Sequence, residues 1–208
     1  QLNDPNFNAK LANFKEFNDT KYDGEIYNIE EQSNKLCNVE FELLPHQQFV
    51  KNFLSYQTPY NCLLLYHGLG TGKTCSAIGV AEETRAYMNN IGINKPIMII
   101  ASPNVSKNFR SQLFNESKLK LVSNVWNLNT CIGPALLDEL NLTQLQGSIS
   151  REIIVTQINS LINKHYIFMG YGEFTNYIKR KIYVKPSDLY SIKDQLDVKI
   201  KKIRKVFN

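Results

Sequence analysis

Residues 67–74 form a glycine-rich segment that ends in a lysine and a threonine, a combination of side chains that suits phosphate binding. In chain order the segment reads His67, Gly68, Leu69, Gly70, Thr71, Gly72, Lys73 and Thr74. In a phosphate-binding loop, or P-loop, the backbone N–H groups of a glycine-rich turn and of the following helix point at one spot, where the helix dipole also favours negative charge. Glycine permits the backbone angles of such a turn and keeps side chains away from the phosphates. The segment therefore predicts that the chain binds a nucleoside triphosphate.

Two side chains of this segment have expected chemical roles. Lys73 is placed to reach the β- and γ-phosphates, and the hydroxyl of Thr74 is the expected ligand of Mg²⁺, which bridges the phosphates. Thr71 is expected to contribute its backbone N–H. His67 departs from the strict pattern, which has Gly or Ala at that position. If the segment is a P-loop, Lys73 and Thr74 are its catalytic residues and Mg²⁺ is its metal. The alternative is a glycine-rich turn that arose by chance.

The segments on either side favour the P-loop over a chance turn. Residues 62–66 are a short continuous apolar run, the pattern of a strand that is covered on both faces in a parallel sheet. After Thr74, apolar residues recur at helical spacing as far as Met88, and Gly92 follows as a stop signal. The order strand, loop and helix is the context that a P-loop requires.

The rest of the chain continues the alternation of strands and helices. Further strands are predicted at residues 96–101, 121–128 and 166–170, and helices at 45–56, 104–114, 134–140, 149–162, 173–181 and 191–207. This alternation predicts an α/β fold, a parallel sheet with helices on both faces. Residues 1–40 are polar and rich in turn residues, so they are predicted to be an extension that precedes a domain at 41–208.

Three motifs together resemble the opening motifs of superfamily 2 helicases and translocases, over about residues 41–115. They are residues 44–47 (Leu-Pro-His-Gln), the P-loop, and residues 99–104 (Ile-Ile-Ala-Ser-Pro-Asn). The resemblance implies a P-loop NTPase whose first RecA-like lobe binds ATP, and it gives Gln47 the role of reading the adenine edge. An amide can pair a donor and an acceptor with adenine simultaneously. A solvated helix residue is the alternative for Gln47, and Gln48 is the alternative in register.

The turn at Ser102, Pro103 and Asn104 falls where the same family contacts a nucleic-acid backbone. The resemblance therefore implies that Pro103 and Asn104 bind nucleic acid through N–H groups and a short polar side chain. The family commonly has Ala-Pro-Thr here, so this sequence differs at two of the three positions. A turn that caps the following helix is the alternative.

A narrower resemblance links residues 63–74 and 166–174 to NTPases of large cytoplasmic DNA viruses, relatives of poxvirus nucleoside triphosphatase I and of the early transcription factor large subunit. It implies work in viral transcription or genome handling, with DNA or RNA, viral RNA polymerase or transcription factors as partners. It also implies the host cytoplasm or the virion as the location. A P-loop enzyme of another class, such as a kinase or an AAA-type ATPase, is the alternative.

Hydrolysis in this family also needs an apolar strand that ends in Asp-Glu, where Asp holds the magnesium shell and Glu activates water. The one candidate is Asp138-Glu139, but Pro134 and the straight-chain leucines before the pair favour a short helix. We therefore expect the acidic strand to lie beyond Asn208, and we expect this chain to bind ATP with little or no turnover.

Charge, cysteines and hydropathy add further expectations. The net charge is +5, and residues 171–208 carry ten Lys and Arg against four Asp and Glu. Residues 191–207 describe a basic amphipathic helix, which offers an alternative function as a docking module of a transcription complex. Four cysteines stand far apart, so we expect free thiols in a reducing compartment. The sequence shows no signal segment and no membrane-spanning stretch, so we expect a chain that is neither secreted nor bound to a membrane.

Overall fold

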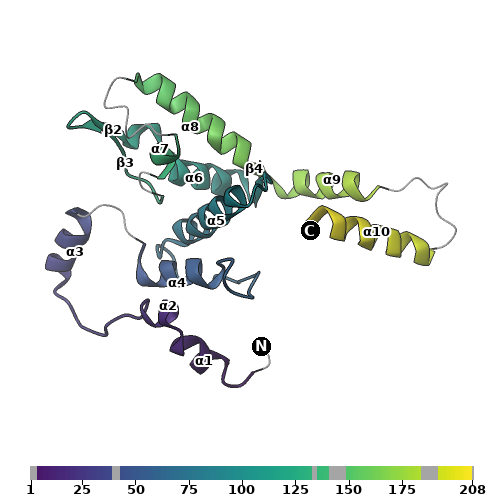
Figure 1. Cartoon of the computed structure of the whole chain (residues 1–208), viewed down its shortest axis with the longest axis horizontal. Coiled ribbons are helices and arrows are strands. Elements are labelled where there is room, and N and C mark those ends of the chain that lie inside the picture. Colours follow the sequence, from purple (N-terminus) through teal and green to yellow (C-terminus); the bar gives the residue numbers. More distant parts are fainter. Residues whose placement is uncertain (1–3, 39–42, 133–134, 141–148, 184–191, 208) are drawn as a thin grey trace. The chain divides into compact units, whose positions relative to one another are not determined.

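The computed structural model describes residues 4–38, 43–132, 135–140, 149–183 and 192–207. Its α-helices are α1 (Phe7–Asn13), α2 (Lys15–Asn18), α3 (Ile29–Asn38), α4 (Pro45–Phe53), α5 (Lys73–Asn90), α6 (Pro103–Leu113), α7 (Ala135–Glu139), α8 (Arg151–His165), α9 (Tyr171–Ile182) and α10 (Ile192–Phe207), and η1 (Glu116–Lys118) is a 3₁₀ turn. Its strands are β1 (Ile97–Ile100), β2 (Leu119–Val122), β3 (Val125–Leu128) and β4 (Tyr166–Met169). The fold is mixed α/β (Figure 1).

By its internal contacts the chain forms two compact units. The first unit is Gln1–Ile97 with Asn108–Tyr166, and the second is Met98–Lys107 with Ile167–Asn208. The glycine-rich segment at residues 67–74 belongs to the first unit, and the turn at residues 102–104 belongs to the second. A boundary at residue 40 between an extension and a domain stays a prediction.

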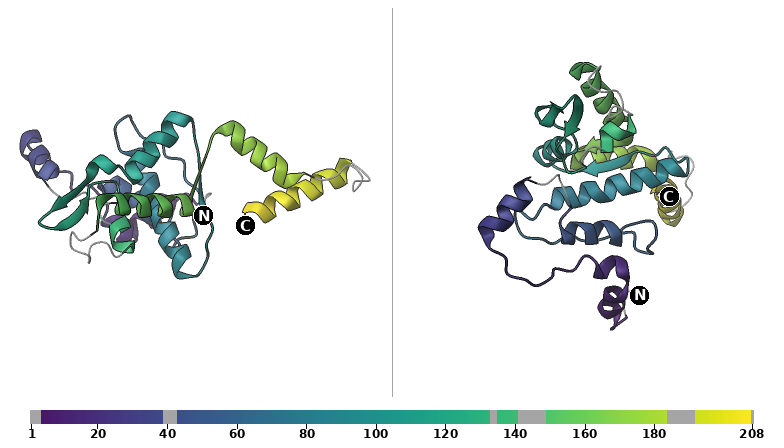
Figure 2. Two further views of the ribbon diagram at one scale, coloured as in Figure 1. Left: turned by 90° about the horizontal axis from the view of Figure 1, so that it is seen from above. Right: turned by 60° about the vertical axis from the view of Figure 1, so that its left-hand side comes forward.

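The helices of the first unit bury the apolar faces that the sequence predicts. Helices α4 and α5 lie side by side (Figures 1 and 2), with Val50 of α4 and Ile78 of α5 buried. Pro45 suits the first turn of α4 because its missing N–H would have no partner there. In α8, Ile154, Ile158 and Ile162 follow a four-residue spacing and are all buried, which confirms the predicted helix.

The first forty residues contain helices that the sequence did not predict. Phe17 of α2 is 4% exposed, and its ring packs against Phe49 and Phe53 of α4. The side-chain amide of Asn52 also donates to the carbonyl oxygen of Glu16, at 2.8 Å. Tertiary packing of one aromatic side chain thus orders a segment whose sequence is dominated by turn residues.

Two of the predicted strands are confirmed, and they pair with each other. β1 and β4 form a two-stranded parallel sheet, and beyond β1 the N–H of Ala101 donates to the carbonyl oxygen of Met169 at 3.0 Å. The segment between them in sequence supplies the crossover that a parallel pair needs. This small parallel pair is compatible with part of a larger sheet.

Residues 121–128 were predicted as one strand, and this prediction is wrong. They fold back as an antiparallel hairpin in which Leu121 pairs with Trp126 and Val122 with Val125. Ser123 and Asn124 form the two-residue turn, with positive φ angles of 49° and 65°. A turn with two positive φ angles matches the twist of a hairpin, and asparagine is favoured there.

The predicted buried strand at residues 62–66 is also wrong. The segment has no regular secondary structure, and Leu64 and Tyr66 are 86% and 93% exposed. A strand is stable only when a neighbour supplies hydrogen bonds along its length. In the part of the chain that the structure describes, the strand pairs are β1 with β4 and β2 with β3, and neither includes this segment. The predicted wide sheet with helices on both faces is therefore seen only as a two-stranded pair.

Candidate nucleotide-binding site

The glycine-rich segment leads directly into α5, as the P-loop prediction requires. Gly72 is the N-cap residue of α5 and adopts a left-handed conformation, with φ 76° and ψ 28°. Gly70 also has a positive φ, of 81°. Glycine reaches this region without the steric cost that a Cβ would bring. The loop thus ends at Lys73, the first residue of a long helix whose unpaired N–H groups and dipole favour an anion.

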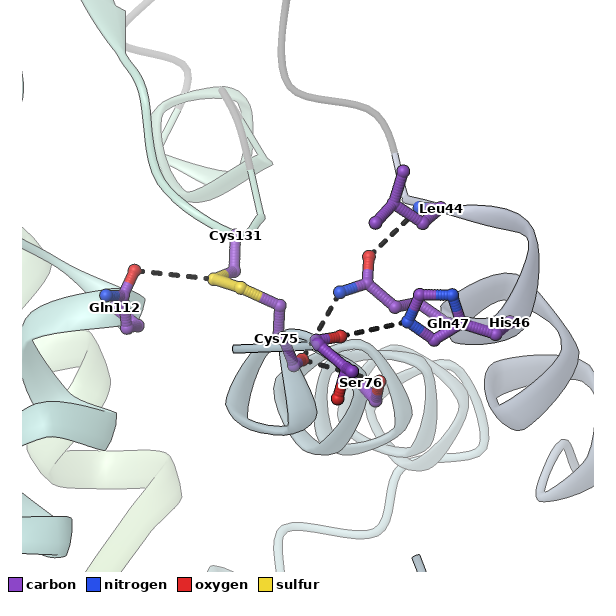
Figure 3. The surroundings of a disulfide bond; sticks show 9 residues. Leu44, His46, Gln47, Cys75, Ser76, Gln112 and Cys131 are labelled. Carbon is purple, nitrogen blue, oxygen red and sulfur yellow. Dashed lines mark hydrogen bonds between the residues drawn. A yellow bond between two sulfur atoms is a disulfide. The ribbon is translucent and has the colours of Figure 1, made fainter. Parts of the chain in front are cut away.

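Two neighbouring side chains of α4 hold two neighbouring carbonyl groups of the loop. The Nε2 atom of His46 lies 2.9 Å from the carbonyl oxygen of Thr71, and Nε2 of Gln47 donates to the carbonyl oxygen of Gly72 at 3.2 Å. Gln47 is 4% exposed, and its Oε1 atom accepts the N–H of Leu44 at 2.9 Å (Figure 3). Helix α4 therefore fixes the last turn of the loop before α5 begins.

The side chain of Lys73 closes the other end of the loop. Its Nζ atom donates to the carbonyl oxygens of His67 and Gly68, at 3.0 and 2.6 Å. The hydroxyl of Thr71 donates to the same Gly68 oxygen at 3.0 Å. Among the described residues Lys73 forms no ion pair. In the described part of the chain, its positive charge therefore faces two carbonyl dipoles, which phosphate oxygens can replace with a stronger interaction.

The remaining predicted residues of the loop occupy the positions expected from their order. Thr74 is half-buried at the second position of α5, next to Lys73. Leu69 is fully exposed at the tip of the loop. His67 is half-buried, and its Nδ1 atom is buried without a hydrogen-bond partner. The structure thus brings the loop and Gln47 together, and the binding roles of these residues stay predictions.

Pro103 and Asn104, the predicted nucleic-acid contacts, are exposed at the start of α6. The carbonyl oxygen of Ser102 accepts the N–H of Ser106 at 2.9 Å, as expected where a helix begins. These residues lie in the second unit, apart in sequence from the glycine-rich loop of the first unit. Their contact with nucleic acid stays a prediction.

Asp138 and Glu139 lie in α7, which confirms the predicted short helix in place of a strand. Glu139 pairs with Arg85 of α5 at 2.6 Å. Arg85 also pairs with Glu82 at 2.6 Å, and its side chain is only 6% exposed. Glu139, whose side chain is 31% exposed, is therefore a partner in an ion-pair cluster that it forms with Glu82 around the buried Arg85.

This cluster shifts the protonation equilibria of its neighbours. Burial alone would lower the pKa of Arg85, but hydrogen bonds and attraction from Glu82 and Glu139 outweigh it and raise that pKa. Burial, assisted by the charge of Glu82, raises the pKa of Tyr166, whose hydroxyl donates to Glu82. Burial and then the positive charge of Arg85 lower the pKa of His165. The raised pKa of Arg85 keeps its guanidinium group charged, and the cluster links α5 to α7 and to the first residue of β4.

Cys75 follows Thr74 directly and forms a disulfide with Cys131. The Cα atoms are 5.3 Å apart, and the bond joins the first turn of α5 to the segment after β3 (Figure 3). Our expectation that these two cysteines are free thiols is therefore wrong. Their separation of 56 residues gives no sign of the pairing in the sequence. Cys62, expected in a buried strand, is a free and exposed thiol.

The sequence also missed a contact between two histidines at the site. The rings of His46 and His67 meet edge to face with centroids 5.5 Å apart, and the hydroxyl of Tyr22 lies 2.7 Å from Nδ1 of His46. Both histidines and Tyr22 line an apolar groove of about 670 Å³ between α4, the amino-terminal helices and residues 63–65. Nothing in the sequence except the position of His46 beside Gln47 could have indicated this contact.

The described residues also bear on two other classes of site, metal centres and membrane-spanning helices. No group of three or more His, Cys, Asp and Glu side chains in the described ranges is arranged to hold a metal ion. Within the same ranges, no helix is both long and apolar enough to cross a bilayer.

Comparisons with known proteins link the chain to viral proteins. A protein of Acanthamoeba polyphaga mimivirus, named "Putative ATP-dependent RNA helicase", is 29% identical over 179 residues, which is 83% of this chain and 28% of the relative. A second mimivirus protein of that name is 39% identical over 94 residues, 44% of this chain and 10% of the relative. A "Putative helicase" of Frog virus 3 (isolate Goorha) is 55% identical over 40 residues, 19% of this chain and 4% of the relative.

No family model and no solved structure matches the chain. The chain spans at most 28% of the length of the relatives named above. Those relatives are proteins of large DNA viruses and are named as helicases, so the similarity supports a helicase-like family for this chain.

Proposed function

We propose that this chain is the first, RecA-like, ATP-binding lobe of a nucleic-acid-dependent ATPase of the helicase and translocase type. The observation that carries the proposal is the loop that ends at Gly72, with Lys73 as the first residue of α5. A helix amino terminus with a glycine-rich approach is an anion site by its backbone alone. The relatives named as helicases support the class of protein in this proposal, a motor that uses ATP to move along nucleic acid.

In this proposal ATP binds with its phosphates in the loop from His67 to Thr74, and Lys73 leaves the loop carbonyls for the β- and γ-phosphates. Thr74 contributes its hydroxyl to Mg²⁺. One amide N–H of Gln47 donates to Gly72, and one lone pair of its oxygen accepts from Leu44. In the proposal, the second N–H and the second lone pair form hydrogen bonds with adenine.

We further propose that this chain binds ATP with little or no turnover. Activation of water needs a free carboxylate near the γ-phosphate. Of the predicted acidic pair, Glu139 is paired with the buried Arg85, and both acidic residues lie in a helix. Nucleic acid would bind through Pro103 and Asn104, in the setting of viral transcription or genome handling.

Calorimetric titration of the whole chain with ATP and Mg²⁺ tests the binding proposal. Lys73→Met removes the only side-chain charge of the loop, so binding should fall at least about tenfold, as for the loss of a charge-assisted hydrogen bond. Lys118→Met, an exposed lysine of η1, is the matched control and should bind as the unchanged chain does. Equal affinities for the two variants would contradict the proposal.

A second candidate function, a docking module of a transcription complex, is favoured by α10. Along this basic helix Leu196, Ile200 and Ile203 are 57%, 43% and 36% exposed, although α10 packs against α9. An exposed apolar stripe is typical of a helix that binds a protein partner. Nucleic-acid binding that requires ATP and weakens with salt would favour the motor. Capture of purified viral RNA polymerase without nucleic acid, lost in Ile200→Asp, would favour docking.

A further inference from the structure

Tyr22, His46 and Thr71 form a chain of hydrogen bonds that leads from the amino-terminal segment into the glycine-rich loop. The hydroxyl of Tyr22 lies 2.7 Å from Nδ1 of His46, and Nε2 of the same ring lies 2.9 Å from the carbonyl oxygen of Thr71. The Tyr22 and His46 rings are stacked, with an angle of 23° between their planes. We propose that His46 is a positioning residue for the phosphate-binding amides, and that Tyr22 sets its tautomer. The inference rests on the proposed function.

The geometry of the peptide unit explains how His46 acts on the loop. In a trans peptide, the C=O of one residue and the N–H of the next point in opposite directions. The chain contains no cis peptide bond among the described residues. When His46 holds the Thr71 carbonyl towards α4, the N–H of Gly72 is turned to the opposite side. In the proposed function this opposite side faces the phosphates, so a contact on α4 orients a donor that it never touches.

The protonation of His46 follows from its two partners. A carbonyl oxygen can only accept, so Nε2 must carry a proton to bond Thr71. In a neutral imidazole the other nitrogen, Nδ1, is then an acceptor, and the hydroxyl of Tyr22 donates to it. A hydrogen bond donated to one ring nitrogen thus keeps the proton on the other nitrogen. In metal sites, a group that hydrogen-bonds the free nitrogen of a histidine ligand fixes the tautomer in a similar way. The segment that carries Tyr22 is therefore part of the nucleotide site.

The tautomer can be measured without any nucleotide. In the whole chain labelled with ¹⁵N at histidine, long-range proton–nitrogen correlation spectra distinguish the two neutral tautomers of His46. We expect one species with the proton on Nε2, and in Tyr22→Phe a detectable fraction with the proton on Nδ1. The side chain of Tyr22 is 65% exposed, so removal of its hydroxyl leaves the core intact. A spectrum that is the same in both proteins would overturn the role of Tyr22.

The affinity for ATP and Mg²⁺ tests the effect on the loop. We expect His46→Phe, which keeps a ring but removes the donor, to bind about tenfold more weakly, and Tyr22→Phe about threefold more weakly, the range for loss of one hydrogen bond. His46→Gln places an amide N–H near the position of Nε2 and should bind nearly as the unchanged chain does. Tyr22→Phe should then have no further effect in the His46→Gln background, because an amide has no tautomer to set.

Tyr27→Phe is the matched control. The hydroxyl of Tyr27 donates to Asp23 in the same amino-terminal segment, whereas the hydrogen bonds and ring contacts of His46 with described residues are those to Tyr22, Thr71 and His67. It should change neither the His46 spectrum nor the affinity. Equal binding by His46→Phe and the unchanged chain would overturn the positioning role. If the unchanged chain fails to bind ATP, the proposed function is wrong. The spectra still show in that case whether Tyr22 sets the tautomer of His46.

Discussion

The side-chain amide of Gln47 donates to the carbonyl oxygen of Gly72, and the same amide nitrogen occupies the space into which a Cβ at position 72 would project. Helix α4 and the glycine-rich loop are therefore fitted to each other at one point. The contact makes the absence of a side chain at Gly72 a requirement of packing as well as of backbone angle.

Gly72→Ala should thus cost more stability than a left-handed glycine normally does. The φ angle of 76° alone costs an alanine about 1 to 2 kcal/mol. The clash with Gln47 adds about 1 to 3 kcal/mol, as other overpacked sites do. Urea unfolding of the whole chain measures the sum.

Gly92→Ala is the matched control for this substitution. Its φ angle is 75°, and a Cβ there would meet no atom within 4 Å, so only the backbone cost remains. Adding Gln47→Ala to Gly72→Ala should recover part of the loss, whereas adding it to Gly92→Ala should not. Equal costs for the two glycine substitutions would show that Gln47 does not fill this space in solution.

Reduction of the Cys75–Cys131 disulfide should destabilise the chain by about 4 kcal/mol, from the loop entropy released by a crosslink over 56 residues. Thermal unfolding with and without a dithiol reductant measures the change. Peptide mapping without reductant identifies the pair directly. Cys131→Ser should unfold at the lower temperature in either condition, while Cys62→Ser, at the free exposed thiol, should behave as the unchanged chain does.

Arg85→Met should destabilise the chain by about 3 to 5 kcal/mol, because it leaves Glu82 and Glu139 without their buried partner. Lys51→Met is the control. This change removes the ion pair between Lys51 and Glu83, whose side chains are 32% and 34% exposed. Such a pair contributes about 0 to 1 kcal/mol to the free energy of unfolding. Similar losses in the two variants, measured by urea unfolding at pH 7, would show that the cluster is solvated.

His165 should make stability depend on pH just below neutrality. Burial, and then the charge of Arg85, lower its pKa below the ordinary 6.5 in the folded chain. The unfolded chain therefore takes up a proton at higher pH than the folded chain. The contribution of His165 to the free energy of unfolding is fully present above pH 6.5 and is lost as the pH drops below it.

Urea unfolding at pH 7.5, 6.5 and 5.5 measures this dependence, and the window lies above the range in which ordinary carboxylates titrate. His165→Phe keeps a buried ring without a titrating group, so its stability should change less between pH 6.5 and 5.5. A loss of equal size in both proteins would assign the dependence to other groups.

Local patterns in the sequence predicted the elements whose stability is local. The four-residue spacing of Ile154, Ile158 and Ile162 predicted α8, and the apolar run before Ser102 predicted β1. The run at residues 62–66 has the same pattern as β1, but no strand among the described residues pairs with it, and no local pattern reveals whether a neighbour exists.

Contacts between distant residues decided the parts that the sequence did not predict. Phe17 orders the amino-terminal segment by packing on α4, although its neighbours in sequence are turn residues. At the site, the residue types of the glycine-rich loop identified the candidate anion site at the start of α5. Two side chains shape it from outside: His46 lies 25 positions before Thr71, and Tyr22 lies a further 24 positions before His46, so only the fold could show them.

The Cys75–Cys131 bond joins two residues that are 56 positions apart and closes the segment between them into a covalent ring. Residues 91–96, just after α5, belong to that ring and are all exposed. A protease that cuts this stretch leaves both products attached to each other, and they separate on a gel only after reduction. The same stretch can receive inserted residues or new chain ends while the first turn of α5 keeps its covalent tether, so a probe can be attached there, at the end of α5 that lies away from the glycine-rich loop.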